Sequence, residues 1–227
     1  SPFGRCTNPP AAVARRLGAA PGRLQYTSPG GNMPQYMVNR TAEEIARGEI
    51  EIALIGGGEA LRTQRGAVKA GIAIDWNEEA EGAYEEPGDM RPGVNDYEMR
   101  HGMRAPIFNY PLFENAIRAN RGRSAAEHQK AIGRLLAGFA RVAHDNPLAV
   151  RREGFSAEQI ATVSPDNRYI GFPYARLMNS NPYIDQSAAL VMTSVGKARE
   201  LGIDPSKWVY LHGCGDAWDH WWVTERV

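Results

Sequence analysis

A helix that runs directly into a strand is the feature that most constrains the fold of this chain. Asn32 is a suitable N-cap, and apolar residues then recur at near-helical spacing up to Gly48. The next apolar stretch, 50–55, is short and rich in isoleucine, and three glycines at 56–58 are expected to stop it. A strand of this kind is typical of the buried part of a helix-covered sheet. The sequence therefore predicts an α/β fold.

The same α/β pattern returns near the end of the sequence. Residues 187–193 are predicted to form a strand, residues 194–201 a helix, and residues 208–211 a further strand. Two α/β portions thus flank a middle part of different character.

The middle part is rich in loops but contains one well-defined helix. Ser124 and Glu127 have the spacing of a capping box, and the helix is expected to end at Asn146. A short capped turn is expected from Ser156, whereas the acidic stretch 75–91 is predicted to be a solvated surface loop. The apolar stripe of the helix comprises Ile132, Leu135, Leu136, Phe139 and Ala143.

Composition limits the classes of partner. The chain has 227 residues, of which 43% are hydrophobic, so it can form a core for one or two small domains. Its 26 basic and 26 acidic residues balance, which argues against nucleic acid as a partner. The 24 glycines and 15 prolines indicate many turns.

Cysteine usage and hydropathy predict a cytoplasmic protein. Cys6 and Cys214 are too few for a disulfide framework, and no apolar run approaches the length of roughly 20 residues that spans a membrane. The first five residues lack both an initiator methionine and the layout of a signal peptide, so we expect a fragment.

Two local motifs invite a functional interpretation. Gly56–Gly58 after a strand would suit a phosphate loop, but Leu61 stands where the last glycine of that fingerprint belongs, so a tight strand–turn packing role is favoured. Metal-ligating residues crowd 212–220, yet their spacing matches no zinc pattern, and a structural role is favoured. A Cys214 nucleophile with His212 as base remains a remote alternative, because i and i+2 residues of a strand rarely reach each other. The crowded residues are His212, Cys214, Asp216, Asp219 and His220.

The helix predicted after Ser124 and the segment that precedes it contain a cluster of basic residues. Such a cluster either attracts the phosphates of a nucleotide-bearing ligand or forms only a solvated helix face. The cluster contains Arg118, Arg121, Arg123, Lys130, Arg134 and Arg141.

Two segments resemble the thiolase superfamily, in particular thiolase-like proteins related to the sterol-carrier-protein thiolases and acetyl-CoA acetyltransferases. Residues 39–59 are similar to the helix, glycine, strand and GGxE turn of a thiolase N-terminal half. Residues 179–194 are similar to the thiolase run GNASxxNDGAAAVLLMS. The resemblance implies part of a thiolase-like fold, a helix-covered mixed sheet with a loop-rich, mostly helical insert. It assigns 1–75 to the N-terminal half, 76–178 to the loop domain, and 179–227 to the end of that half and the start of the next.

The resemblance also implies a site. The thiolase cysteine nucleophile begins a helix whose N-terminus stabilises the thiolate, and Gly31 occupies its position here. Gly30 and Gly31 would offer backbone N–H groups, and Asn181 stands where related enzymes use a serine to contact pantetheine. Phe108 falls near the position of the loop-domain histidine. The GHP-type histidine and the CxGGG cysteine are expected beyond Val227.

Three functions follow as expectations. The first is an acyl-CoA-binding protein or acyltransferase in lipid or sterol metabolism, in which Arg134 contacts the phosphates of a coenzyme A thioester. The second is a non-catalytic acyl-CoA- or lipid-binding subunit. The third is a thiolase-like aldolase that works by proton transfer. We expect a homodimer or hetero-oligomer, because a partial fold exposes a sheet face, and we expect no metal and no covalently bound cofactor.

Overall fold

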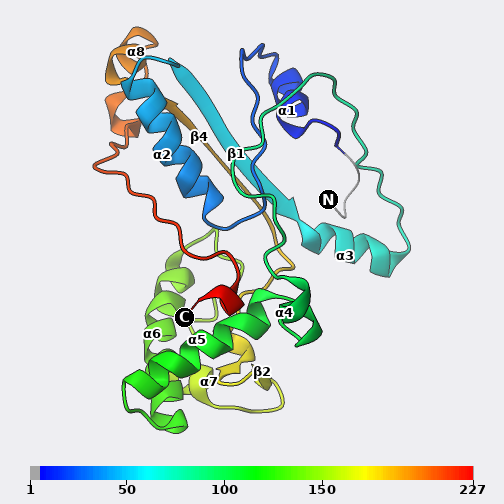
Figure 1. Cartoon of the computed structure of the whole chain (residues 1–227), viewed down its shortest axis with the longest axis vertical. Coiled ribbons are helices and arrows are strands. Elements are labelled where there is room, and N and C mark those ends of the chain that lie inside the picture. The colour runs from blue at the N-terminus through cyan, green and yellow to red at the C-terminus, as the bar shows by residue number, and fades with distance from the viewer. Residues whose placement is uncertain (1–5, 227) are drawn as a thin grey trace. The chain divides into compact units, whose positions relative to one another are not determined.

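The computed structural model describes residues 6–226, and these form two compact units (Figure 1). Unit 1 contains the residues up to Arg91 together with Tyr183–Asp219. Unit 2 contains Pro92–Pro182 and the residues from His220 onward. The larger part of unit 2, Pro92–Pro182, is therefore inserted into the sequence of unit 1.

Unit 1 is organised around a long two-stranded ribbon. Strands β1 (Ile52–Ala60) and β4 (Asp185–Thr193) pair antiparallel, with Ile52 opposite Thr193 and Ala60 opposite Asp185. Helix α2 (Met33–Ala46) packs along both strands (Figure 1). The other elements of this unit are α1 (Pro9–Leu17), α3 (Leu61–Ala70), α8 (Val195–Glu200) and the 3-10 turn η2 (Pro205–Lys207).

The three glycines do not stop β1, so the predicted end of the strand at residue 55 is wrong. Gly56–Gly58 lie opposite Ser187–Ala189, and the strand continues to Ala60. A Cβ atom added at Gly58 would lie 3.0 Å from the Cβ of Ser187, so the small residues allow the two backbones to approach closely. The phosphate-loop and strand–turn interpretations of these glycines are excluded by this pairing.

The other predictions for unit 1 have mixed outcomes. The helices predicted before residue 48 and after residue 194 are confirmed, as is the strand around 187–193. Asn32 precedes α2, but its side chain makes no capping hydrogen bond. The strand predicted at 208–211 is wrong, because these residues are irregular and 96% of Val209 is exposed.

The ribbon is more exposed than the sequence predicts. The first residues of β1 alternate between exposed and half-buried, residues 56–59 are exposed, and most of β4 is exposed as well. Neither strand is fully buried. The sheets within residues 6–226 are small and antiparallel, where the sequence predicts a mixed sheet. The overall α/β character is confirmed.

The acidic stretch 75–91 is a loop, as predicted, but its side chains are not merely solvated. Glu78 forms ion pairs with Arg15 and Arg16, at 2.6 and 2.7 Å. Glu85 accepts hydrogen bonds from Arg23 and Gln25. The loop is thus attached to the segment that precedes α2.

Unit 2 is mostly helical. The capping boxes at Ser124 and Ser156 are both present, which confirms the predicted helix and the predicted capped turn. The elements are α4 (Asp96–Arg100), α5 (Pro106–Asn120), α6 (Ala125–Asp145), α7 (Ala157–Ala161), β2 (Tyr169–Gly171), β3 (Tyr174–Ala175), η1 (Arg176–Met178) and η3 (Val223–Glu225). No helix within residues 6–226 is long and apolar enough to cross a membrane.

The packed face of α6 differs from the predicted apolar stripe. Leu135 and Phe139 are each 65% exposed, whereas His128, Gln129 and Gly133 are buried. The stripe prediction is wrong for Leu135 and Phe139 because α7 packs against α6 at Gly133, where no side chain intervenes.

Substitution of Gly133 tests this close approach. A Cβ atom there would lie 2.5 Å from the Ala157 carbonyl oxygen, so we expect Gly133→Ala to lower the free energy of unfolding by about 1–3 kcal/mol. Gly138, on the same helix, has open space, and Gly138→Ala should raise it by up to about 1 kcal/mol. Urea unfolding of both variants makes the comparison, and equal effects would contradict the close packing of α6 and α7.

A fully buried carboxylate fixes the last described residues of unit 2. Glu98 accepts hydrogen bonds from the backbone N–H groups of Asn95, at 3.1 Å, and Thr224, at 2.8 Å. The indole N–H groups of Trp221 and Trp222 both donate to the Pro92 carbonyl. Burial alone would raise the pKa of Glu98, but the hydrogen bonds donated by Thr224 and Asn95 hold this pKa below its usual value.

The Glu98 hydrogen bonds predict a pH-dependent stability. Because the folded state lowers the pKa of Glu98, its contribution is present above the unfolded pKa and is lost as the pH falls through the folded pKa. We expect Glu98→Gln to cost about 1–3 kcal/mol at pH 7 and progressively less below about pH 4. Denaturant unfolding at a series of pH values measures this cost in the free energy of unfolding. Asp96 is exposed on the same helix, and Asp96→Asn is the control. A cost that does not depend on pH would contradict the assignment.

Candidate functional site

The two glycines of the predicted nucleophile position lie in the turn that leads into α2. Both are exposed, between the buried residues Ser28 and Met33. The backbone N–H of Met33 donates to the Gly30 carbonyl, at 3.1 Å, which closes the turn. A Cβ atom at Gly31 would meet no other atom within 4 Å, whereas one at Gly30 would lie 2.7 Å from Asn32 Oδ1. A side chain at position 31 would therefore be accommodated.

Buried polar contacts hold α2 in place behind this turn. Glu44 is paired with Arg23 and Arg40, at 2.9 and 3.0 Å. Burial acts to raise the pKa of Glu44, but these two guanidinium groups outweigh it and lower this pKa. The buried Asn39 donates to Asp216 Oδ1, at 3.0 Å, so the segment containing Asp216 lies against the helix.

The remote cysteine site gains no support from the structure. Cys214 and His212 are both exposed, and no hydrogen bond joins them in the described part of the chain. Residues 6–226 also contain no group of three or more His, Cys, Asp or Glu side chains placed to hold a metal ion. Trp218, from the same segment, makes an edge-on contact with Tyr36 of α2, with ring centroids 6.1 Å apart.

Arg134 lines a pocket of about 530 Å³ on α6. Arg141 and His144, which follow it on the same helix, line the pocket as well, and Phe155 and Ser156 form another wall. The carbonyl oxygen of Arg152 lies 2.7 Å from His144 Nδ1, which fixes the imidazole at the rim. The pocket is therefore a concave, cationic surface.

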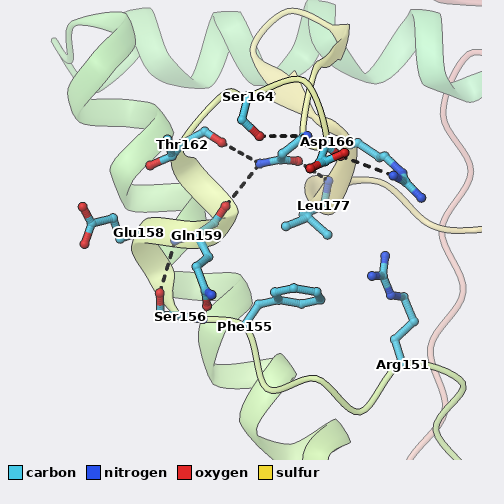
Figure 2. A pocket seen from close by; sticks show the side chains of 11 residues that line it. Arg151, Phe155, Ser156, Glu158, Gln159, Thr162, Ser164, Asp166 and Leu177 are labelled. Atoms are coloured by element: carbon cyan, nitrogen blue, oxygen red, sulfur yellow. Dashed lines mark hydrogen bonds between the residues drawn. The ribbon is translucent and has the colours of Figure 1, made fainter.

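A second pocket of about 470 Å³ adjoins the first, because Phe155 and Ser156 line both (Figure 2). Figure 2 shows the Phe155 ring near the centre, with Leu177 and Arg151 around it. The buried Asn167 donates to three backbone carbonyls, including those of Gln159 and Thr162, and accepts from the Leu177 N–H. Asn167 thus connects α7, the loop after it and η1 into one rigid wall.

Some of the charged side chains that line the second pocket already interact with other residues of the protein. The Arg151 guanidinium lies 5.1 Å from the Phe155 ring centroid and pairs with Glu153 at 2.9 Å. Arg176 donates to the Asp166 carbonyl. An aromatic face beside guanidinium groups suits a planar group that carries negative charge. The sequence did not indicate Phe155, Arg151 and Arg176 as a group: Arg151 and Phe155 lie near the capped turn at Ser156, but Arg176 is 20 residues further along the chain.

The remaining candidate residues lie elsewhere in unit 2. Asn181 is exposed in the irregular segment between η1 and β4. Phe108 is on α5 and is about half exposed. The structure therefore brings Gly30 and Gly31 together in unit 1, and it brings Arg134 together with Arg141 and His144 in unit 2.

Unit 2 also contains a buried polar cluster that the sequence did not indicate. Glu114 Oε1 lies 2.6 Å from His128 Nε2, and the Tyr174 hydroxyl donates to Glu114 Oε2 at 2.5 Å. Burial, followed by the hydrogen bond to Glu114, raises the pKa of Tyr174. The cluster connects α5, α6 and β3, and we assign it a structural role.

Comparison with known proteins is informative for the solved structures. The sequence matches no protein-family model and no curated protein. Among solved structures, the chain is similar to a monomeric SCP2-thiolase like protein type 1 from Mycobacterium smegmatis, with a TM-score of 0.71 and 34% sequence identity. The similarity covers 89% of this chain and 37% of that protein, so the chain spans little more than a third of the relative's length.

Proposed function

Because this is a partial thiolase-like chain, related to the SCP2-thiolase-like proteins, we propose that it binds an acyl-CoA. The observation that carries the proposal is the exposed Gly30–Gly31 turn just before α2, which we assign to the position of the thiolase nucleophile. Glycine has no side chain that an acyl group can modify. The proposed function is thus binding of the thioester without an acyl-cysteine intermediate at residue 31.

The Gly30–Gly31 turn offers its backbone to the thioester end of the ligand. N–H groups at a helix N-terminus stabilise a partial negative charge, so the carbonyl oxygen of a thioester is a suitable acceptor. The side-chain amide of Asn181 is proposed to contact the pantetheine portion, which carries amide groups of its own.

In unit 2, the cationic pocket around Arg134 is proposed to hold phosphates. Coenzyme A carries several phosphate oxygens, and guanidinium groups bind phosphate through paired, charge-assisted hydrogen bonds. Arg134 and Arg141 supply two such groups, about two turns apart on α6, and His144 lies at the same pocket. The adjoining Phe155 ring provides an apolar face for the adenine base.

The proposal also covers the domain organisation of the chain, its oligomeric state, its cellular location and its metabolic role. Residues 1–75 and 179–227 are assigned to a helix-covered thiolase-like sheet, and 76–178 to its loop domain. A cytoplasmic setting, an oligomer and a role in lipid or sterol metabolism belong to the same proposal. The Mycobacterium smegmatis relative, by contrast, is described as monomeric.

Substitution of the two pocket arginines tests phosphate binding. We expect Arg134→Gln and Arg141→Gln each to weaken binding of acetyl-CoA about tenfold, the loss of one charge-assisted contact. Isothermal titration calorimetry of acetyl-CoA measures the affinity. Arg199→Gln removes the same charge from α8 in unit 1 and should leave the affinity unchanged. Equal losses of affinity in all three variants would show that only the net charge matters and would contradict a phosphate site at Arg134 and Arg141. If acetyl-CoA does not bind saturably to the chain without substitutions, the proposed function is overturned.

Introduction of a thiol at position 31 tests the assignment of the nucleophile position. We expect Gly31→Cys incubated with acetyl-CoA to gain the mass of one acetyl group, because the thiolate attacks the thioester carbonyl and the coenzyme A thiolate leaves. Intact-protein and peptide mass spectrometry locate the modification. The unmodified chain should gain none; acetylation of its Cys6 or Cys214 would contradict the proposal.

A further inference from the structure

The acidic loop makes backbone contacts with the segment that leads into the Gly30–Gly31 turn. The N–H of Tyr26 donates to the Glu85 carbonyl at 2.9 Å, and the N–H of Ser28 donates to the Pro87 carbonyl at 3.1 Å. The N–H of Glu85 in turn donates to the Leu24 carbonyl. These bonds run alongside each other, so residues 24–28 and 85–87 form a short parallel pairing that ends just before the turn.

Gly88, the residue after this pairing, lies against the residues at both ends of the turn. It has a φ of +111°, a backbone conformation that residues with a side chain rarely adopt. A Cβ atom at position 88 would collide with Ser28 Oγ, and it would lie 2.9 Å from Met33 Cε. Ser28 and Met33 are only 3% and 4% exposed, and they flank the exposed residues 29–32. Gly88 therefore touches both residues that anchor the turn.

We propose that Gly88 is a positioning residue, which fixes the Gly30–Gly31 turn at the start of α2 through its close contact with Ser28 and Met33. The acidic loop is then the support of the candidate site, not a solvated connection. A larger residue at position 88 displaces Ser28 or Met33 and moves the backbone that lies between them. The importance of this position for ligand binding rests on the proposed function, but the contact itself does not.

Thiol chemistry at residue 31 provides a readout that is independent of coenzyme A. In a Cys6→Ser, Cys214→Ser, Gly31→Cys background the only thiol lies in the turn. Its reaction rate with Ellman's reagent across pH reports the thiolate fraction, which depends on its placement at the helix N-terminus. We expect Gly88→Ala in this background to change the rate by about threefold or more, because thiol reactivity follows the local electrostatic environment.

Gly82 provides a matched control. Its φ of +101° resembles that of Gly88, but a Cβ atom there would meet only Asn8 Nδ2, at 3.8 Å. Gly82→Ala thus introduces similar backbone strain in the same loop and should leave the thiol rate unchanged. Ser28→Gly combined with Gly88→Ala removes Ser28 Oγ and Cβ, so that only the flexible end of the Met33 side chain has to shift, and it should restore the original rate.

The outcomes separate this inference from the proposed function. Equal thiol rates in the Gly88→Ala and Gly82→Ala variants, or a defect that Ser28→Gly does not rescue, would overturn the positioning role. If Gly88→Ala prevents folding, the double variant Ser28→Gly, Gly88→Ala decides the question. The inference requires that this double variant folds and that its thiol reacts at the original rate. Calorimetry with acetyl-CoA on the unmodified chain tests the proposed function separately, and its failure would leave the thiol result intact.

Discussion

The antiparallel pairing of β1 with β4 is the constraint on which the rest of the structure depends. Its register places Ile52 opposite Thr193 and Ala60 opposite Asp185, which brings together two segments separated by the whole of Pro92–Pro182. The two strands approach closely at Gly58, where an added Cβ atom would lie 3.0 Å from the Cβ of Ser187. Helix α2 packs along this ribbon, so the ribbon also determines where the candidate turn before α2 is held.

The candidate site combines an open turn with firm supports. Gly31 has free space around it, yet the residues on either side of the turn are buried, and Glu44 and Asn39 attach α2 to neighbouring segments. In unit 2, capping and the Asn167 hydrogen bonds likewise give a rigid wall to two adjoining pockets. A protein with these features is suited to hold a ligand.

Local signals in the sequence predicted local structure well. The capping boxes at Ser124 and Ser156 were readable because the interacting residues are three positions apart. The sequence could not show that Gly56–Gly58 continue a strand, because that depends on a partner far along the chain. For the same reason it missed the contact of Gly88 with Ser28 and the gathering of Phe155, Arg151 and Arg176. The relation to thiolases was recognisable from residues 39–59 and 179–194, and the structural match supports it.

Hydrogen–deuterium exchange with and without acetyl-CoA tests the central claim most directly, because it reports on both contact regions in one experiment without any substitution. The account predicts slower exchange at residues 29–36, where the turn enters α2, and at residues 134–156, around the Arg134 pocket. Exchange that is unchanged by saturating acetyl-CoA, or protection confined to other segments, would contradict the claim that this chain binds an acyl-CoA through these residues.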